Sequence, residues 1–407
     1  MNCEDPDGFK MLQSVLAIQQ LIISAIVVTC FVATKTLLDN YRKRQARMCT
    51  VIVGAGPVGL TALMVAAKSG RVSKIVLYEE QGKQMLFNTP HQIAFDSKSV
   101  CFLRKLGVDF DNIEGCWDCG CFFTRLGVFL EYMLSVVYRL PVPVEVRLGT
   151  KFTRECLREL EGLEGRKMVI ACDGANGQTG RHLGLSDEYT QHSCRFYGAV
   201  AMFERTAECQ IPLRERRQHN LHFDLTAYGA DSGDVDGHQG FSLKIFGTSR
   251  HRYLTLVIPK CETPLVKALR VVLDRSMMRN IFLKCFNTYK SESESTLSDS
   301  YALKHMKFSP RLFEIKLSQR LETAAYFQDM DIFVVAEGEA ARCYNINTGL
   351  DVNIGIQGLQ SLQQFLDMAA VADSEHSILT ALALKSQHAE QVCKDFLRNG
   401  LREQMMT

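Results

Sequence analysis

The chain has 407 residues, of which 46% are hydrophobic and 23% are charged, and its formal net charge is +2. This is the composition of a globular protein, long enough to fold into two or three packed subdomains. The small net charge argues against an extended nucleic-acid surface, so we expect no nucleic-acid partner.

Residues 1–48 predict a membrane anchor followed by a basic stalk. No charged residue occurs between Met11 and Thr34, and about 20 apolar residues suffice to span a bilayer. Acidic residues predominate before this run and basic residues after it, so the positive-inside rule predicts a single-pass membrane protein whose main body faces the cytosol. The alternative is a helix buried against the body, because Gln19 and Gln20 interrupt the apolar run.

The rest of the sequence predicts an α/β nucleotide-binding domain that is interrupted by a strand-rich insertion. Residues 49–184 show a β-α-β pattern with further helices, and residues 185–330 show the alternation typical of half-exposed strands. Residues 331–407 begin with an apolar strand and end in helices. We therefore expect a two-part nucleotide-binding domain, 49–184 and 331–407, with the sheet subdomain 185–330 over one face.

The strongest local signal is a glycine-rich loop between a strand and a helix. The strand at 50–53 is followed by a G-x-G-x-x-G loop, a helix, and a second strand that ends at Glu79. The first glycine allows a tight turn, the second lets the backbone approach a pyrophosphate, and the third lets helix and strand pack closely. A carboxylate at Glu79 is placed to accept ribose hydroxyls, which favours FAD or NAD over NADP. The predicted binding residues of the loop are Gly54, Ala55, Gly56, Pro57, Val58 and Gly59.

The 15 cysteines do not follow the spacing of a zinc site. Cys116 and Cys119 form a single CxxC, with Cys121 close behind, and no second CxxC or histidine pair accompanies it. We expect no metal ion and free thiols in a reducing compartment, with a redox-active thiol pair as the alternative.

Two later motifs indicate which dinucleotide is bound. After an apolar strand, Asp173 begins an Asp-Gly pair, and near the C-terminus Gly338 and Glu339 follow another strand. Beyond them, Gly349 and Asn353 belong to a stretch that matches G-x-G-x-N-x-G except at its second glycine. These motifs resemble the DG and GD elements of the group A flavoprotein monooxygenases, the family of para-hydroxybenzoate hydroxylase.

The resemblance implies FAD as cofactor and roles for these residues. Asp173 would lie near the flavin and the path of the pyridine nucleotide, and Glu339 would hold the ribityl chain at Gly338. Gly349 and Asn353 would open a helix aimed at the flavin pyrimidine, where a helix N-terminus stabilises negative charge.

A closer resemblance, to the monooxygenase domain of the MICAL proteins, is carried by Asn88-Thr89-Pro90-His91 and by strand-like stretches of the insertion. It implies that Asn88 lies beside the flavin. Arg125 stands at the start of a helical run, where the group A family often has an arginine that reaches the FAD pyrophosphate. The alternative for Arg125 is an ordinary solvent-facing residue at a helix start.

The function implied is an NAD(P)H-dependent monooxygenase that activates O2 as a flavin C4a-hydroperoxide and oxidises a substrate between the insertion and the flavin. The cofactor carries this chemistry, so no catalytic residue is assigned. The substrate would be a small or lipophilic molecule, with a protein as a further possibility. The same motifs would serve a membrane-associated flavin reductase or dehydrogenase, which is one alternative. The departures from the family at Glu339, in place of aspartate, and at Asp351, in place of glycine, motivate a second alternative, a non-catalytic FAD-binding scaffold.

Overall fold

The structure, a computed structural model, describes residues 24, 26–38, 41, 45–162, 165–206, 210–224, 240–271 and 274–406. The chain forms two compact units, Met1–Arg47 and Met48–Thr407. In the first unit, residues 26–38 are helical. Across the described ranges, no helix is both long and apolar enough to cross a membrane. The predicted anchor depends largely on residues 11–23, which lie outside those ranges.

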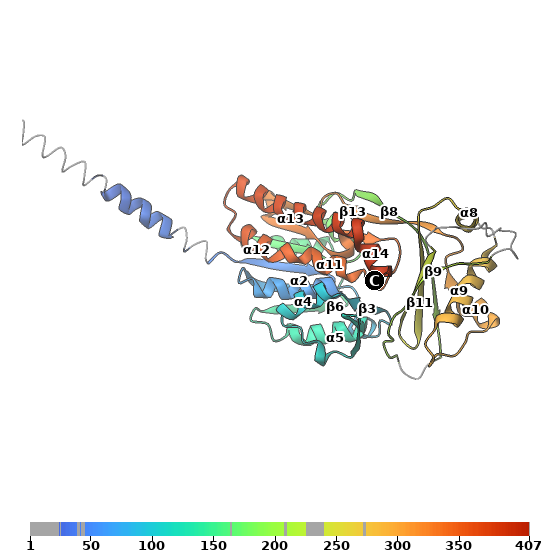
Figure 1. Cartoon of the computed structure of the whole chain (residues 1–407). Coiled ribbons are helices and arrows are strands. Elements are labelled where there is room, and N and C mark those ends of the chain that lie inside the picture. The colour runs from blue at the N-terminus through green and yellow to red at the C-terminus, as the bar shows by residue number, and fades with distance from the viewer. Residues whose placement is uncertain are drawn as a thin grey trace, which may run out of the picture. The chain divides into compact units, whose positions relative to one another are not determined.

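A six-stranded sheet forms the base of the second unit, in the order β14-β15-β7-β1-β2-β6 (Figure 1). Neighbouring strands are parallel, except that β14 runs antiparallel to β15. The central strand β1 lies between β2 and β7, as expected for a Rossmann-type core. The strands are β1 (Met48–Val53), β2 (Val72–Glu79), β6 (Val144–Leu148), β7 (Lys167–Ala171), β14 (Ala324–Phe327) and β15 (Ile332–Ala336).

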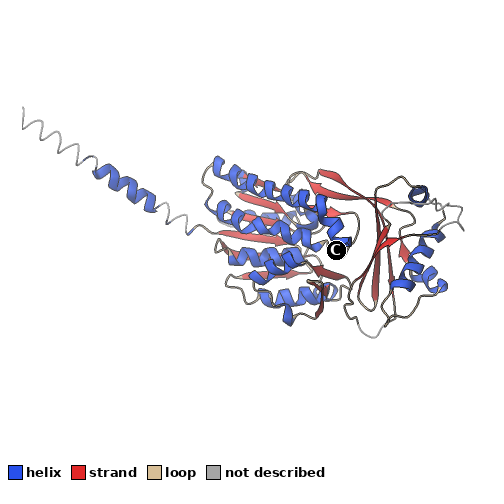
Figure 2. Cartoon of the chain, in the orientation of Figure 1, coloured by secondary structure: helices blue, strands red, loops and turns tan. Residues whose placement is uncertain are grey.

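Helices cover both faces of this sheet, because alternate side chains of its strands point to opposite sides. Ile52 of β1 belongs to the core beneath α2, α5 and α12, whereas Val51 and Val53 belong to the core on the side of α6. The mixed α/β fold expected from the sequence is therefore confirmed (Figure 2). These helices are α2 (Pro57–Lys68), α5 (Leu126–Val137), α6 (Arg154–Glu161) and α12 (Leu362–Val371).

The strand-rich insertion forms a seven-stranded antiparallel sheet, in the order β16-β13-β8-β11-β10-β9 with β12 paired to β8. Helices α8 (Pro264–Val271), α9 (Arg275–Tyr289) and α10 (Asp299–His305) lie on the side of this sheet away from α2 and α11 (Figure 1). The strands are β8 (Tyr189–Glu204), β9 (Arg216–Leu221), β10 (Phe241–Gly247), β11 (His251–Pro259), β12 (Lys307–Phe308), β13 (Phe313–Arg320) and β16 (Arg342–Tyr344).

The boundary predicted near residue 330 does not separate the strands of the two sheets, because one strand on each side of it belongs to the other sheet. Strand β14 lies before that boundary but pairs with β15 in the six-stranded sheet. Strand β16 lies after it but pairs with β13 in the seven-stranded sheet. The chain therefore crosses between the sheets more often than the hydrophobic pattern alone indicates.

Smaller elements complete the unit. A three-stranded sheet, β3-β5-β4, lies beside the six-stranded sheet. Its strands are β3 (Gln92–Phe95), β4 (Gly115–Asp118) and β5 (Cys121–Arg125). The remaining short helices are α3 (Lys83–Phe87), α4 (Ser97–Lys105), α7 (Thr179–His182), α11 (Val352–Gly358), η1 (Phe110–Asn112), η3 (Gln328–Met330), η4 (Gly338–Ala340) and η5 (Leu359–Ser361).

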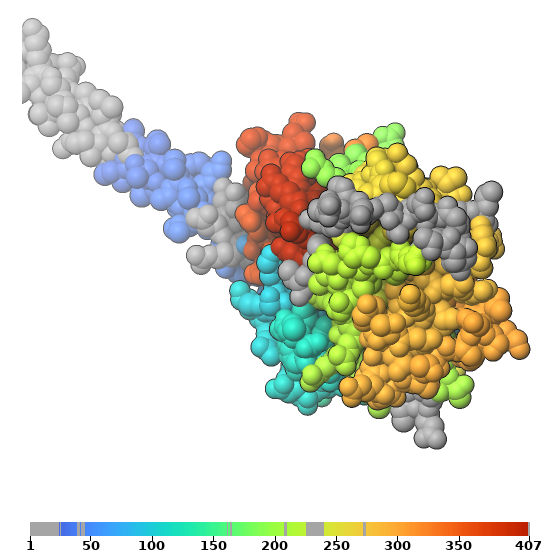
Figure 3. All heavy atoms as spheres, turned by 45° about the vertical axis from the view of Figure 1, so that its right-hand side comes forward, coloured from blue at the N-terminus to red at the C-terminus, as the bar shows by residue number. Residues whose placement is uncertain are grey.

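The C-terminal helices return to the junction of the two sheets. Helix α13 (Glu375–Asp395) continues through a π-helical turn, η6 (Phe396–Gly400), into α14 (Leu401–Met406). Helix α14 contacts β9 and β10, and in Figure 3 the C-terminal residues border those of the insertion. Leu401 and Met405 share a core with Val257 of β11 and Ile346, so the end of the chain fills space beside the insertion.

Candidate functional site

The three glycines of the loop each satisfy a different steric demand. Gly54 has φ +101°, and a Cβ there would lie 2.3 Å from the Cys172 carbonyl oxygen. A Cβ on Gly59 would lie 1.9 Å from the Gly54 carbonyl oxygen, so that position is fixed by close helix–strand packing. A Cβ on Gly56 would meet no atom within 4 Å. Gly56 therefore faces open space, as a pyrophosphate cradle requires.

The N-terminus of α2 faces the same space. Its first residue is Pro57, and no side chain caps the helix at Gly56. Glu79 Oε2 accepts a hydrogen bond from the Ala55 N–H (2.6 Å), and Oε1 accepts one from the Gln81 N–H (2.8 Å). The Glu79 carboxylate thus holds the glycine loop against the end of β2. The uncapped helix end carries a partial positive charge and suits an anionic group.

These elements open into a cavity of about 1260 Å³. Pockets for ordinary small ligands span about 300–1,000 Å³, so this one is large enough for a dinucleotide. Of the predicted cofactor-binding residues, the following line it: Gly54, Gly56, Pro57, Val58, Glu79, Asp173, Gly338, Glu339 and Gly349. The structure thus brings the three sequence motifs together around one cavity.

Asp173 and Glu339 line the cavity from the segments that follow the paired strands β7 and β15. Asp173 Oδ2 accepts a hydrogen bond from the Thr179 N–H (3.0 Å), which orders the start of α7. A Cβ on Gly174 would lie 3.9 Å from Glu339 Oε2. Withdrawal from bulk water raises the pKa of Glu339, and the nearby Asp351 carboxylate adds to this effect. Glu339 is placed to accept a hydrogen bond from a hydroxyl group of a bound ligand.

Gly349 and Asn353 shape the far end of the cavity in different ways. Gly349 has φ +77°, and a Cβ there would lie 2.9 Å from the Phe246 ring. Asn353 is buried and does not line the cavity. Its Nδ2 donates to the carbonyl oxygens of Ala94 (2.9 Å) and Leu350 (2.8 Å), and its Oδ1 accepts from the Asp96 N–H (3.0 Å). Asn353 therefore fixes the cavity wall from behind.

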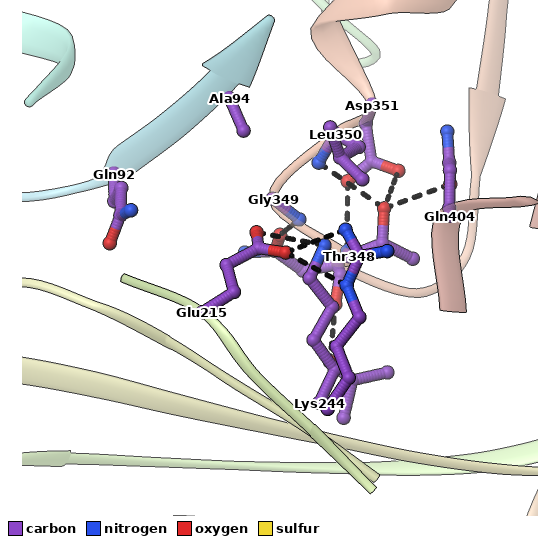
Figure 4. A network of polar contacts seen from close by, with 12 residues as sticks. Gln92, Ala94, Glu215, Lys244, Thr348, Gly349, Leu350, Asp351 and Gln404 are labelled. Atoms are coloured by element: carbon purple, nitrogen blue, oxygen red, sulfur yellow. Dashed lines mark hydrogen bonds and ion pairs between the residues drawn. The ribbon is translucent and has the colours of Figure 1, made fainter. Parts of the chain in front are cut away.

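Asp351 stands where the resemblance to the group A family implies a glycine, and its side chain does not cap α11. Its Oδ2 accepts a hydrogen bond from the Thr348 N–H (3.0 Å), and its Oδ1 accepts one from the Thr348 hydroxyl (2.8 Å). Figure 4 shows Thr348 between Asp351 and Gln404. Burial raises the pKa of Asp351. The carboxylate lines the cavity but is turned toward its own loop.

Five of the predicted residues do not line this cavity, namely Ala55, Gly59, Asn88, Arg125 and Asn353. Asn88 ends α3 and is exposed. Arg125 donates from Nη1 to Gln210 Oε1 (3.3 Å). His91, in contrast, lines the cavity and stacks on Tyr253 with 5.7 Å between ring centroids. Burial lowers the pKa of His91, so its imidazole is neutral at neutral pH.

A buried charge cluster behind the cavity was missed by the sequence analysis. Glu337 precedes the Gly338-Glu339 motif and is fully buried. Its carboxylate pairs with Arg342 (2.9 Å) and with Lys385 of α13. Lys385 also donates to the Gly358 carbonyl oxygen (2.9 Å). The cluster ties α13 to the motif, and no local pattern around Lys385 indicated it.

The described cysteines are free, and Cys116 and Cys121 lie on the neighbouring strands β4 and β5. In the part of the chain that the structure describes, no three His, Cys, Asp or Glu side chains form a group that could hold a metal ion.

Of the seven-stranded sheet, strand β16 contributes to the cavity wall through Arg342, Cys343 and Tyr344. Among the described residues, none of β8 to β11 lines it. Phe246 of β10 stacks on Tyr253 of β11 (5.4 Å), and Tyr253 stacks on His91. The insertion thus meets the cavity wall at His91, through Tyr253 of β11. The sequence predicted a substrate pocket between the insertion and the flavin.

No family model matches the chain, and no curated protein matches it. Among solved structures, the peptidyl tryptophan dihydroxylase QhpG is 13% identical, with a TM-score of 0.52 over 89% of this chain and 76% of its own. CtdE in complex with FAD is 12% identical (TM-score 0.49, 89% and 93%). A variant of HpxO from Klebsiella pneumoniae complexed with FAD is 13% identical (TM-score 0.46, 86% and 88%). At these identities the likeness concerns the fold alone, and the chain shares its fold with QhpG.

Proposed function

We propose that this protein is an FAD-dependent monooxygenase that uses NAD(P)H and O2. The observation that carries the proposal is the cradle at Gly56, open to the cavity and facing the uncapped start of α2. The motif residues Asp173, Glu339 and Gly349 line the same cavity. A bound flavin would supply hydride acceptance and oxygen activation, and the protein would supply binding, orientation and exclusion of water.

Different residues along the cavity would hold different parts of FAD. The loop N–H groups at Gly56 would bind the pyrophosphate, with Glu79 holding the loop and accepting ribose hydroxyls. Glu339 would hold the ribityl chain. The start of α11 near Gly349 would face the pyrimidine edge and stabilise negative charge there. The likeness to the MICAL domain remains a prediction from the sequence.

A flavin reductase or oxidase is the second candidate, and one observation favours it. None of the described residues of β8 to β11 lines the cavity, and Tyr253 of β11 stacks on His91 of the cavity wall. An enzyme that passes electrons from NAD(P)H to O2 or to another acceptor needs no substrate pocket between the insertion and the flavin.

The absorption spectrum of the purified full chain tests the function. We expect a flavin spectrum with about one FAD per chain, bleached by NADPH or NADH without O2 and restored by air. Peroxide release that accounts for all the NAD(P)H consumed would favour the reductase or oxidase, and peroxide formation well below it in the presence of a substrate would favour the monooxygenase. A chain purified without flavin, and unable to take up added FAD, would contradict both.

We further propose that residues 1–48 anchor the protein in a membrane, with the FAD-binding body on the cytosolic side. Exposed apolar side chains in the described part of this segment support an apolar environment, namely Ile26, Val27, Val28, Phe31 and Val32. An anchor would also favour a lipophilic substrate.

Paired lysine substitutions test the anchor. A lysine at the centre of a membrane helix costs about 2.5–3.5 kcal/mol, so Val27→Lys with Phe31→Lys should release the protein into the soluble fraction. Thr34→Ser is the control and should remain in membranes. If the unchanged protein is found in the soluble fraction, the anchor does not exist.

A further inference from the structure

The hydrogen-bonded chain Asp351–Thr348–Gln404 has one hydrogen too few if Asp351 is ionised. The Thr348 hydroxyl lies 2.8 Å from Asp351 Oδ1 and 3.0 Å from Gln404 Oε1. A carboxylate oxygen and an amide oxygen are both acceptors, and a hydroxyl has one hydrogen to donate. One of the two contacts therefore lacks a donor.

A proton on Asp351 Oδ1 removes this conflict. The acid then donates to the Thr348 oxygen, and the Thr348 hydroxyl donates to Gln404 Oε1. If Asp351 is ionised, Thr348 donates to Asp351, and the Gln404 amide must turn so that Nε2 faces Thr348. Gln404 Nε2 is buried and has no hydrogen-bond partner in the present orientation. With Gln404 Oε1 facing Thr348, as in Figure 4, both contacts of the Thr348 hydroxyl have a donor only if Asp351 is protonated.

The surroundings of Asp351 balance the two protonation states. Burial favours the neutral acid, whereas the Thr348 N–H and the positive charge of Lys244 favour the carboxylate. Lys244 is itself buried and paired with Glu215 (2.9 Å), which weakens its electrostatic effect on Asp351. The titratable or charged groups that interact with Asp351 belong to three other elements: Lys244 of β10, Glu339 of η4, and Cys343 and Tyr344 of β16.

We propose that Asp351 takes up one proton at Oδ1 when a bound flavin is reduced, while the Thr348 hydroxyl turns from Asp351 to Gln404 and the Gln404 amide turns its Oε1 toward Thr348. The proposal rests on the proposed function, because Asp351 lines the cavity at the end assigned to the flavin pyrimidine. Two electrons from a hydride donor add negative charge at that edge, and a like charge nearby favours protonation of a carboxylate. The proton comes from water, and the only new bond on the protein is Asp351 O–H.

Asp351 would thereby remove the charge conflict that its replacement of glycine creates. It opposes the reduced flavin only while ionised, and the hydrogen-bonded chain accommodates either state. Asp351 would then be the proton acceptor of the reductive half of the reaction.

The pH dependence of the flavin midpoint potential tests this, measured by spectroelectrochemical titration of the FAD-loaded full chain between about pH 5 and about pH 9. One additional proton per two electrons steepens the slope by about 30 mV per pH unit. The steep range should lie between the pKa of Asp351 with oxidised flavin and its pKa with reduced flavin. The variant Asp351→Asn should show no steep range. The midpoint potentials of wild type and Asp351→Asn should converge at low pH, where Asp351 is neutral in both flavin states. At high pH, the wild-type potential should be the lower of the two.

Two further variants sharpen the result. Thr348→Val removes a hydrogen bond that favours the carboxylate, so the steep range should move to higher pH. Asp367→Asn removes a carboxylate that pairs with Arg71 outside the cavity and should reproduce the wild-type curve. If Asp351→Asn fails to fold, Thr348→Val still tests the proposal.

A difference between wild type and Asp351→Asn that stays constant over the whole pH range would overturn the proposal, as would a steep range that does not move in Thr348→Val. A carboxylic-acid band in the reduced-minus-oxidised infrared spectrum, absent from Asp351→Asn, would support it independently. A protein that binds no FAD refutes the proposed function, whereas an FAD-loaded protein with equal slopes refutes only the role of Asp351.

Discussion

Gly56→Val should fold normally and lose its FAD. The backbone at Gly56 is extended (φ −69°, ψ 177°), which valine adopts readily, and a Cβ there meets no protein atom within 4 Å. The new side chain would occupy the space in which the pyrophosphate must lie. Overfilling a packed site costs about 1–3 kcal/mol or more, so FAD affinity should fall by about fivefold to more than about a hundredfold. FAD per chain after gel filtration, and the circular dichroism of the apoprotein, measure the two effects.

Gly82→Val is the matched control for this change. Gly82 also precedes a helix, α3, its backbone is similarly extended (φ −70°, ψ 158°), and a Cβ there also meets nothing within 4 Å. It does not line the cavity. The control should keep its FAD. Full flavin content in Gly56→Val would show that the pyrophosphate lies elsewhere.

Glu337→Gln should cause a large loss of stability. Glu337 is the carboxylate between Arg342 and Lys385, and all three side chains are almost completely buried. Burial by itself would raise the pKa of Glu337, but the two cations outweigh it and hold the pKa below its usual range. Removing one partner of a buried ion pair costs about 3–5 kcal/mol, because the remaining charges lose their counter-ion without regaining water. Urea denaturation followed by circular dichroism measures the loss.

Glu390→Gln provides the comparison on the same helix as Lys385. Glu390 pairs with Lys394 at 3.3 Å, and both side chains are about 60% exposed. An exposed pair of this kind contributes about 0.3–0.5 kcal/mol. The double variant Glu337→Gln with Lys385→Met should be less destabilised than the sum of the single variants, because it removes a buried charge together with its partner. Equal stability of Glu337→Gln and Glu390→Gln would mean that the buried cluster does not stabilise the fold.

The glycine-rich loop at residues 54–59 is the part of this protein whose conformation follows most directly from the sequence. The roles of Gly54, Gly56 and Gly59 follow from backbone geometry within a few residues, and the structure places each as its role requires. The buried strand β1 and the mixed α/β fold could likewise be predicted, because a strand buried on both faces needs an apolar run. Local rules succeed here since the interacting groups are neighbours in the sequence or joined by regular sheet pairing.

The functions of Asp351, Asn353 and Glu337 were decided only by the tertiary structure. Asn353 belongs to a glycine motif, yet its partners are the backbone of Ala94 on β3 and of Asp96 at the start of α4, which turns it away from the cavity. The orientation of Asp351 depends on Thr348 and, through it, on Gln404 in the last helix. Glu337 precedes a recognised motif but is neutralised by Lys385, far along the chain.

The physical reason is that burial and charge pairing depend on which segments meet in space. A motif specifies the conformation of its own backbone, whereas the direction of a polar side chain follows from the donors and acceptors that other segments bring to it. The sequence by itself determined the conformation of the glycine-rich loop and the α/β class. Only the packing of the insertion and of the C-terminal helices against that loop decided which polar residues face the cavity and which support it from behind.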